Sequence, residues 1–569
     1  MTRRAIVVAV FALSAWAMVV YVTGGVSGEL FGLKMSSRSV ARPLVVAVLL
    51  LAYAVFAHGR RSPDADVEWL SRALRPAMAP LVAAIAAGIV AVGLVHGIVS
   101  AAGADGYGYV SQADLWLRHE LRIEQPFVEK MPLPFADWSF SPLGYRPVPG
   151  AHVLVPTYAP GLPILMAAFK AIAGSRGPYL VVPIFGGLAV WLCYLLGVRA
   201  GSPLAGTIAA LLLASSPVFL FQLMWPMSDV PAAACWTAAL AGVLGTGRYS
   251  PAVAGVCTAV AVAIRPNLAP LAAIPLAYLI WAGRGWRAYV LGVLPGMCLV
   301  AAVNAYLYGS PLASGYGNLD SLYKLSHAPT NVKRYAGWLL TTETPLVALA
   351  LIALVKPSRA PTRPRTVHRW LAVFGAGVCV AYVFYSPFDD WWYLRFLLPA
   401  MPALFVSMGA GIVWATSRLP TLPQALALSC GTMLLMGYRA NFALSHSVLE
   451  FREGERRYET VGLYAASSTP PNAVFMSMQH SGSLRYYAGR LTMRYDWVPG
   501  DWLDRAIAML REQGYRPYIV LEEWEEPVFR KRFGDASDTG RLAWPPVKEF
   551  KNGMPVRVYE PPGPTIRLP

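Results

Sequence analysis

Long runs of apolar residues alternate with short polar segments along most of the chain, a pattern typical of membrane-spanning helices. The run from Ala79 to Ala104 contains no charged residue at all. A helix needs about 20 mostly apolar residues to cross the hydrocarbon layer of a bilayer. We therefore predict a polytopic α-helical membrane protein with about 13 transmembrane helices, at residues 5–24, 42–58, 77–104, 179–197, 204–222, 229–246, 250–265, 267–283, 287–308, 335–355, 370–386, 394–414 and 422–438.

Two segments outside these helices are long. The first, residues 103–178, is rich in Pro, Trp and Tyr, so we expect it to fold against the bilayer surface. Within it, "PTYAPGLPILMAAFKAIAG" is apolar but short and rich in proline. These properties favour an interfacial or re-entrant helix over a full crossing.

The second long segment follows Tyr438 and predicts a small α/β domain. "AVFMSM" (Ala473–Met478) and "PYIVLE" (Pro517–Glu522) have the pattern of short buried strands. Between them, "DWLDRAIAMLREQG" places four apolar residues on one helical face: Leu503, Ala506, Ile507 and Leu510. We divide the chain into two additional N-terminal helices with a basic loop (residues 1–76), a membrane domain (77–438) that includes the long segment 103–178, and a C-terminal domain (439–569).

The composition agrees with a membrane protein. The 569 residues are 56% hydrophobic and 14% charged, with a mean hydropathy of +0.46, whereas soluble domains carry about 25% charged residues. A net charge of +17 could indicate a nucleic-acid partner, but residues 439–569 are nearly balanced, with 18 Lys and Arg against 16 Asp and Glu. The excess positive charge lies in short loops between predicted helices, so we expect no nucleic-acid binding.

The basic loops predict an orientation, because loops rich in Lys and Arg stay in the cytoplasm. The basic residues of alternate loops are Arg3 and Arg4, then Arg60, Arg61, Arg72 and Arg75, then Arg284 and Arg287, then those of residues 356–369. This places the N-terminus inside and the C-terminal domain outside, in a multi-pass protein of the plasma (inner) membrane. The first helix exceeds the 7–15-residue apolar core of a cleaved signal peptide, so we predict an anchor.

Several motif classes are absent from the sequence. It has no Walker loop, no dinucleotide-binding glycine motif, no HExxH or CxxC motif, and no internal repeat. An ATP-driven pump or a nucleotide-sugar enzyme would need a soluble cytoplasmic domain, and every predicted cytoplasmic loop is short. All six cysteines lie in predicted helices, so we expect neither a disulfide framework nor a cysteine metal site.

Asp105 is the leading candidate for a catalytic residue. It directly follows the long uncharged run, opens the segment 103–178, and is followed by Tyr107, Tyr109 and Gln112. The alternative is a boundary role, because acidic residues are common where a membrane helix meets water and carboxylates in clefts can be structural.

Other charged residues belong to the same predicted face. Asp229 begins a helix in "QLMWPMSDVPAAA", and we favour a helix cap formed by Ser228 or Asp229, although Asp229 could serve both as a cap and in the site. Arg265 lies between two helices, where a charge needs a partner. Arg395 follows Asp389 and Asp390, so it could pair with one of them or extend to the interface. Either arginine could instead bind a phosphate in bidentate geometry.

The C-terminal motif "QHSGSLRYYAGR" contains His480 and Arg490. Its polar and aromatic residues are those that carbohydrate or lipid-headgroup contacts require. It could equally be an ordinary connection between a strand and a helix.

Together these pieces resemble the polyprenol-phosphate-sugar-dependent membrane glycosyltransferases of the GT-C fold, which include protein O-mannosyltransferases and lipid A aminoarabinose transferases. The resemblance covers about residues 77–560. It rests on six motifs in order: "ADGYGYVSQADLW", "PTYAPGLPIL", "SSPVFLFQLMWPMSDVPAA", "YGSPLASGYG", "YSPFDDWWYLRFLLPAMPAL" and "PPNAVFMSMQHSGSLRYYAGR".

The resemblance implies an inverting transfer of a sugar from a polyprenyl-phosphate donor to a hydroxyl of a cell-envelope glycan, lipid or protein, on the extracytoplasmic membrane face. In this family an aspartate at the start of the first large outer loop acts as the base, and Asp105 occupies that position. Protein O-mannosyltransferases have Glu next, whereas Gly106 follows here, which disfavours a protein acceptor. We assign substrate contacts to Tyr107, Tyr109, Gln112, Tyr158, Asp229, Arg265, Tyr316, Asp389, Asp390, Arg395, His480 and Arg490.

The residue types fit this chemistry independently of the family resemblance. A sugar hydroxyl is a poor nucleophile, so a carboxylate must take its proton, and an arginine can stabilise the charge that grows on the departing lipid phosphate. No cofactor is required, although a divalent metal ion could lie between Asp105 and Asp229. Besides the donor and acceptor, membrane lipids are the expected partners.

Three other functions remain open. The main alternative is a lipid-linked sugar flippase or transporter, but such proteins often show paired repeats or broken helices with charges at mid-membrane, and neither is evident. Glycan polymerases and ligases tend to carry their long loop late in the chain. A structural scaffold would not need a cluster of polar residues at one face.

Overall fold

The computed structural model describes residues 3–23, 26–30, 33–37, 39–58, 61–355, 363–551 and 553–563. Some of the basic residues used to predict the orientation lie outside the described residues. These are Arg60, Lys356 and Arg359. The first two helices flank a short antiparallel hairpin of β1 (Val26–Leu30) and β2 (Leu33–Ser37).

Each segment predicted to span the membrane contains one or more helices. The helices are α1 (Arg3–Thr23), α2 (Ala41–His58), α4 (Met78–His96), α8 (Val181–Ala200), α9 (Pro203–Ser215), α10 (Pro217–Leu223), α11 (Asp229–Leu244), α12 (Ser250–Ile264), η3 (Pro266–Ala272), α13 (Ala273–Trp281), α14 (Trp286–Tyr308), α16 (Ala328–Glu343), η5 (Pro345–Leu349), α17 (Ala350–Val355), α18 (Arg363–Val383), η6 (Trp391–Ala400), α19 (Met401–Thr416) and α20 (Thr421–Ser445). A further helix, α3 (Arg61–Leu74), is polar and links α2 to α4.

Among the described residues, five helical stretches are individually long and apolar enough to cross a membrane, and two bent helix pairs raise this number to seven. The other predicted crossings correspond to shorter apolar helices or to α20. The total of thirteen transmembrane helices therefore stays a prediction.

Both bent pairs break at a proline. α9 and α10 meet at 59° at Ser216–Pro217, and α16 meets the following helical segment Pro345–Val355 at 100° after Thr344. Proline has no N–H to donate, and it disfavours the helical conformation in the residue before it. The hydroxyl groups of Ser216 and Thr344 accept hydrogen bonds from backbone N–H groups that open the next helix, which caps each break.

A buried ion pair joins these bends to α20. Arg439 lies 2.7 Å from Glu343 at the end of α16, and neither side chain is exposed. Ser216 donates to the other oxygen of Glu343 (2.5 Å), and Arg439 also donates to the carbonyl of Leu212 (2.8 Å). Neither charged residue was among the candidates from the sequence, although charges within apolar helices usually have partners.

The predicted helix 77–104 is shorter than expected. α4 ends at His96, Gly97 is extended, and a new helix, α5 (Gly103–Arg118), begins after a short non-helical stretch. Asp105 therefore lies in the first turn of α5 and not in a loop. The backbone must turn here because Gly103 has a positive φ of 56°, which glycine adopts without strain.

The rest of the segment 103–178 is folded. It contains β3 (Ile123–Glu124), η1 (Pro126–Lys130), α6 (Ala136–Ser139), β4 (Tyr145–Val148), β5 (Val153–Pro156), α7 (Gly161–Ala173) and η2 (Gly174–Leu180). The strands form an antiparallel sheet in the order β3-β5-β4. α7 is the helix predicted from "PTYAPGLPILMAAFKAIAG".

The chain after α20 contains the two strands and the helix predicted there, β6 (Ala473–Met476), β8 (Arg516–Glu522) and α24 (Leu503–Glu512), together with further helices and strands. The further elements include α21 (Phe451–Glu455), α22 (Arg457–Ser468), α23 (Ser481–Ala488), β7 (Leu491–Met493), α25 (Glu525–Phe533), β9 (Lys548–Phe550) and β10 (Val556–Tyr559). The strands form one mixed sheet in the order β7-β6-β8-β10-β9, with β6 parallel to both of its neighbours. The four apolar residues predicted to share one face of α24 are all buried.

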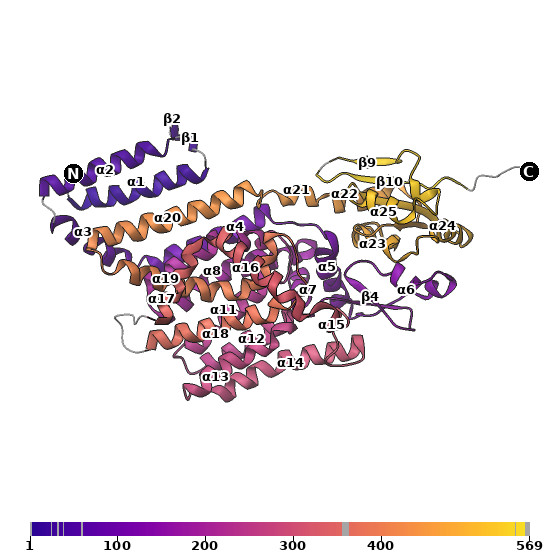
Figure 1. Ribbon diagram of the computed structural model, residues 1–569, viewed down its shortest axis with the longest axis horizontal. Coiled ribbons are helices and arrows are strands. Elements are labelled where there is room, and N and C mark those ends of the chain that lie inside the picture. Colours follow the sequence, from indigo (N-terminus) through magenta and orange to yellow (C-terminus); the bar gives the residue numbers. More distant parts are fainter. Residues whose placement is uncertain are drawn as a thin grey trace, which may run out of the picture.

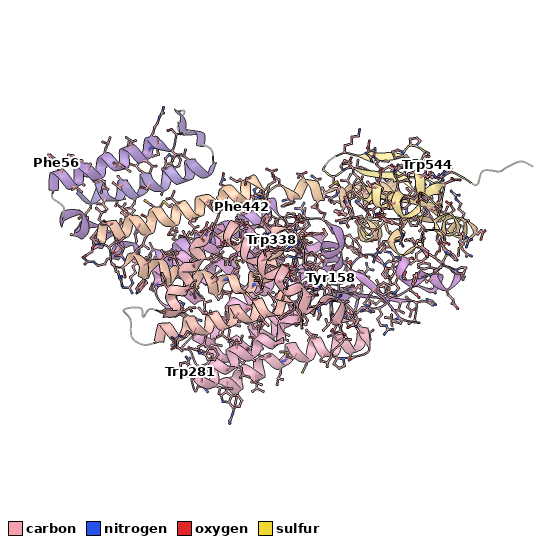
Figure 2. All side chains as sticks on the ribbon, in the orientation of Figure 1. Phe56, Tyr158, Trp281, Trp338, Phe442 and Trp544 are labelled. Carbon is pink, nitrogen blue, oxygen red and sulfur yellow. The ribbon has the colours of Figure 1, made fainter. Side chains whose placement is uncertain are left out.

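Figure 1 shows this C-terminal sheet beside α5, α6 and β4, at one end of the helical bundle and far from the N-terminal hairpin. Tyr158 lies where the bundle meets the C-terminal segment, whereas Phe56 and Trp281 lie at the outer edges of the bundle (Figure 2). Phe56 is 94% exposed, as expected for a side chain that contacts lipid. Tyr158, one of the candidate site residues, therefore lies at the end of the bundle next to the C-terminal segment.

The Glu343–Arg439 pair yields a prediction about stability. Replacing Glu343 with Gln leaves the Arg439 charge buried without its partner, which costs on the order of 3–5 kcal/mol. We expect E343Q to lower the melting temperature of the purified protein strongly. The double variant E343Q/R439M, which removes both charges, should recover most of this loss, and E453Q at an exposed ion pair is the matched control. Equal melting temperatures for E343Q and E453Q would contradict the assigned role.

Candidate active site

Asp105 is held by a tyrosine and faces an arginine. The Tyr158 hydroxyl donates to Oδ1 of Asp105 at 2.6 Å, and Arg395 Nη1 lies 3.8 Å from Oδ2. The Asp105 side chain is 36% exposed and that of Arg395 is 18% exposed, so both line an accessible surface. One carboxylate oxygen is therefore fixed, and the other is only loosely paired.

Arg395 contacts the ends of several elements. It lies in η6, its Nη1 also contacts the Met227 sulfur (3.4 Å), and its guanidinium lies over the rings of Tyr393 and Phe396. Its Nε is buried and has no hydrogen-bond partner among the described residues. A guanidinium that keeps unused donors beside an exposed carboxylate is suited to receive an anion.

The partners expected for Arg395 from the sequence were wrong. Asp389 instead pairs with Arg334, and its side chain is 83% exposed. Asp390 is also exposed. The turn at the start of η6 directs Arg395 into the bundle while both aspartates stay at the surface.

A second, tighter ion pair lies next to the first. Arg265 Nη2 donates to Oδ1 of the fully buried Asp229 at 2.7 Å. Arg265 also donates through Nε to the Ser228 hydroxyl (3.1 Å) and through Nη1 to the Tyr382 hydroxyl (3.2 Å). The expectation that Arg265 has a partner is confirmed, and most of its N–H donors are occupied.

The favoured interpretation, a helix cap formed by the side chain of Ser228 or Asp229, was wrong. Ser228 is the N-cap residue of α11, and no side chain caps the helix with a hydrogen bond. Asp229 lies one residue inside, where its carboxylate pairs with Arg265. An arginine 36 residues away is a stronger partner for a buried carboxylate than a local N–H group, and local sequence does not reveal it.

Tyrosines connect Asp105 to this second pair. The Tyr109 hydroxyl donates to Ser228 (3.1 Å), and the Tyr109 ring lies 4.5 Å from that of Tyr158. Tyr316, which is 52% exposed, packs edge-on against Tyr158. Burial, and then the negative charge of Asp105, raise the pKa of Tyr158 well above its ordinary value. Tyr158 therefore stays protonated and remains a donor to the carboxylate.

Two further predicted site residues on α5 are buried. Gln112 is fully buried, and its amide atoms have no hydrogen-bond partner among the described residues. Tyr107 packs against Tyr145 and against the C-terminal segment. Neither side chain contacts Asp105, so their assignment to substrate stays a prediction.

The C-terminal segment braces the start of α5. Just before α5, the Ala101 N–H donates to the Tyr487 hydroxyl (2.8 Å) and the Ser100 hydroxyl donates to the Glu455 carbonyl (3.0 Å). A Cβ atom placed on Gly482 would lie only 2.1 Å from the Tyr107 ring. The first turn of α23 and the first turns of α5 are thus in direct contact, and the position of Asp105 depends on both.

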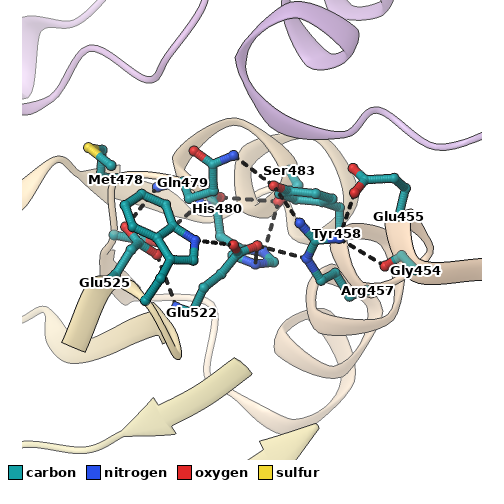
Figure 3. Close-up of polar contacts among 12 residues, drawn as sticks. Gly454, Glu455, Arg457, Tyr458, Met478, Gln479, His480, Ser483, Glu522 and Glu525 are labelled. Carbon is teal, nitrogen blue, oxygen red and sulfur yellow. Dashed lines mark hydrogen bonds and ion pairs between the residues drawn. The ribbon is translucent and has the colours of Figure 1, made fainter. Parts of the chain in front are cut away.

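A buried polar network supports this contact (Figure 3). Glu522 accepts hydrogen bonds from Arg457 (2.8 Å) and Trp524 (2.6 Å), and it lies 3.3 Å from Nε2 of His480. The Gln479 side chain donates to the Tyr458 hydroxyl (2.8 Å). The Gln479 amide nitrogen and the Tyr458 hydroxyl lie close to the start of α5. They are the atoms nearest to the position that a side chain on Gly103 would take.

His480 and Arg490 therefore have partners within the C-terminal segment. His480 is fully buried and stacks on Tyr458, while Arg490 donates to three backbone carbonyls. Burial lowers the pKa of His480, so it is neutral beside Glu522 at physiological pH. Their proposed contact with substrate stays a prediction, as does that of Asp389 and Asp390.

A metal site was left open by the sequence. Within the described ranges, no group of three or more His, Cys, Asp or Glu side chains lies close enough to hold a metal ion. Asp229 is already paired with Arg265 and Asp105 with Tyr158. A divalent metal ion between Asp105 and Asp229 stays an untested possibility from the sequence, and we derive no step through one.

The contact between α23 and α5 makes a direct prediction. In G482A the added methyl group would collide with the Tyr107 ring, and α5 must shift or loosen. We expect faster amide hydrogen exchange in residues 103–112 than in the native chain. G454A, in which the added methyl group meets no atom within 4 Å, is the control. Unchanged exchange in G482A would show that the C-terminal segment does not brace α5.

Glu525 predicts a pH dependence of stability. It accepts hydrogen bonds from the backbone of Gln479 and Glu522 and from Tyr495, yet burial raises its pKa to about 7. The folded state then binds more protons than the unfolded chain between about pH 4.5 and 7, so stability falls as pH rises through this window, by up to ~3 kcal/mol. E525Q should flatten the melting temperature between pH 5 and 8, whereas E512Q on the surface of α24 should not.

The sequence matches no known protein-family profile and no curated protein. Among solved structures, the fold is similar to that of ArnT from Cupriavidus metallidurans bound to undecaprenyl phosphate, with a TM-score of 0.50 at 12% identity over 84% of this chain and 97% of ArnT. For apo ArnT the TM-score is 0.52 at 13% identity, with the same coverage. Mycobacterial arabinofuranosyltransferase AftD matches with a TM-score of 0.50 at 13% identity, over 84% of this chain and 41% of AftD. The chain therefore has the GT-C fold of these glycosyltransferases, the fold predicted from its sequence motifs.

Proposed function

We propose that this protein is an inverting glycosyltransferase that moves a sugar from a polyprenyl-phosphate donor to a hydroxyl group of a cell-envelope acceptor. The observation that carries the proposal is the pairing of an accessible carboxylate, Asp105, with an incompletely satisfied arginine, Arg395, 3.8 Å away. A base and an anion-binding group side by side are what a transfer from a phosphate ester to an alcohol requires. The GT-C fold and the undecaprenyl phosphate bound by the ArnT neighbour support it.

Asp105 acts as the general base. The acceptor hydroxyl approaches Oδ2, the oxygen that Tyr158 does not occupy, and gives up its proton as its oxygen bonds to the anomeric carbon of the sugar. The bond from that carbon to the phosphate oxygen breaks in the same step, and its electron pair leaves with the lipid phosphate. A single displacement of this kind inverts the anomeric configuration.

Arg395 stabilises the leaving phosphate. Its buried Nε lacks a partner among the described residues and its contact to Asp105 is long, so it can turn donors toward an anion. Arg265 has three hydrogen bonds already, so it contributes positive potential without a direct contact. We therefore assign the phosphate contact to Arg395 and a supporting role to Arg265.

The predicted orientation puts this site at the extracytoplasmic face of the membrane, with the N-terminus in the cytoplasm and the C-terminal segment outside. The phosphate linkage of the donor itself activates the sugar for transfer, so no nucleotide is needed.

The test is the release of polyprenyl phosphate from radiolabelled polyprenyl-phosphate sugars, incubated with the purified protein in lipid and an envelope extract. We expect release by the native chain and a loss of about 10²–10⁴-fold in D105N, because a general base contributes about that factor. R395K should lose about 10²–10³-fold, since lysine cannot reproduce the forked geometry. D538N, an exposed aspartate in the C-terminal segment, should be unaffected.

The outcomes separate the alternatives. Equal release by D105N and the native chain would contradict the assignment of the base. Donor binding without release by any form, together with movement of the intact donor across the bilayer, would identify a flippase. In that case D105N would leave the donor bound but unmoved.

A further inference from the structure

A basic cavity lies beside the proposed active site. It has a volume of about 710 Å³ and is bordered by β4, by the C-terminal end of α14 and by the segment that follows α14. Arg122 and Arg146 both line it, and none of the lining residues is acidic. The proposed mechanism uses neither arginine.

The charges of these two arginines are not neutralised. Arg146 donates to the backbone carbonyls of Ser314 and Gly315 (3.2 and 3.3 Å), and Arg122 donates to the carbonyl of Tyr306 (3.4 Å). Neither forms an ion pair with any described residue. Two half-buried guanidinium groups without a carboxylate create a positive potential that favours an anion.

The surroundings of the cavity suit the membrane surface. α14 is long and apolar enough to cross a bilayer, and the cavity lies at its C-terminal end. Large apolar side chains are exposed beside it: Leu312 is 93%, Tyr306 57% and Leu319 50% exposed. Leucine and tyrosine around arginines are typical of the interface between headgroups and acyl chains. An anion bound here would therefore be carried by a lipid.

The cavity is physically connected to Asp105. Arg146 fixes the carbonyls of residues 314–315, directly before Tyr316, and Tyr316 packs against Tyr158, which hydrogen-bonds to Asp105. From the same strand as Arg146, Tyr145 hydrogen-bonds to Ser111 on α5 (2.8 Å). The cavity and Asp105 are thus linked by a chain of contacts that runs through the half-exposed Tyr316 ring.

We propose that the cavity between β4 and α14 binds an anionic, lipid-anchored group at the extracytoplasmic surface of the plasma membrane, and that this group belongs to the acceptor substrate. The proposal rests on the proposed function for the identity of the acceptor, but not for the binding itself. Arg122 and Arg146 hold the phosphate or carboxylate, the exposed apolar side chains contact the lipid, and the acceptor hydroxyl extends past Tyr316 to Asp105. Donor and acceptor thus use different arginines.

Binding is measured first, without turnover. Native mass spectrometry of the full chain in detergent would follow three probes: dioleoyl phosphatidic acid, dioleoyl phosphatidylcholine and inorganic phosphate. We expect the native chain to prefer phosphatidic acid over phosphatidylcholine at least tenfold, and R122Q/R146Q to lose this preference. R176Q removes an equal charge from η2, outside the cavity, and should keep it. R122Q alone serves as the second variant, because Arg146 also holds a loop and its loss could disturb folding.

Each outcome decides the proposal. Equal preference for phosphatidic acid in R122Q/R146Q and the native chain, with unchanged melting temperatures, would overturn the site. Tight binding of inorganic phosphate, lost in R122Q/R146Q, without any preference for the lipid would overturn the lipid anchor. In the release assay, R122Q/R146Q should raise the KM for the envelope acceptor at least tenfold while the KM for the donor stays unchanged. Failure of the proposed function would appear differently, as no release by the native chain.

Discussion

The Asp229–Arg265 ion pair is the interaction on which the arrangement of the site depends. A charge at the end of an apolar bundle is stable only with a partner of opposite sign, and this pair joins α11 to the end of α12 at 2.7 Å. Because Asp229 is committed to Arg265, the neighbouring Arg395 is left with a long 3.8 Å contact to Asp105. The Asp229–Arg265 pair is short and its carboxylate is fully buried, while the Asp105–Arg395 pair is longer and its carboxylate is partly exposed.

The second constraint is the position of α5, which carries Asp105. From the bundle side, Tyr109 ties α5 to Ser228 and thereby to the Asp229–Arg265 pair. From the other side, Gly482 allows α23 to contact Tyr107 so closely that no side chain could be accommodated. The C-terminal segment thus packs against α5 and helps to position the Asp105 carboxylate.

Much of this fold could be predicted from the sequence, because apolar runs and strand patterns are local signals. The helical segments, the C-terminal strands β6 and β8 and the buried face of α24 all follow from such patterns. The partners of Arg395 and Asp229 could not be predicted in this way, since proximity along the chain favoured Asp389 and a helix cap. The true partners lie tens or hundreds of residues away, and only the packing of α5, α11, α12 and η6 brings them together. The pairing of Glu343 and Arg439 could have been suspected from the sequence, because each is a charged residue within or next to an apolar helix and such residues usually have partners.

The most direct test of the account is a structure of the protein with a non-hydrolysable polyprenyl phosphonate sugar bound. The account predicts that the phosphonate lies within hydrogen-bond distance of Arg395 and that the anomeric carbon faces Oδ2 of Asp105, with Arg265 still paired to Asp229. A phosphonate bound elsewhere, with the Asp105–Arg395 contact unchanged, would contradict it.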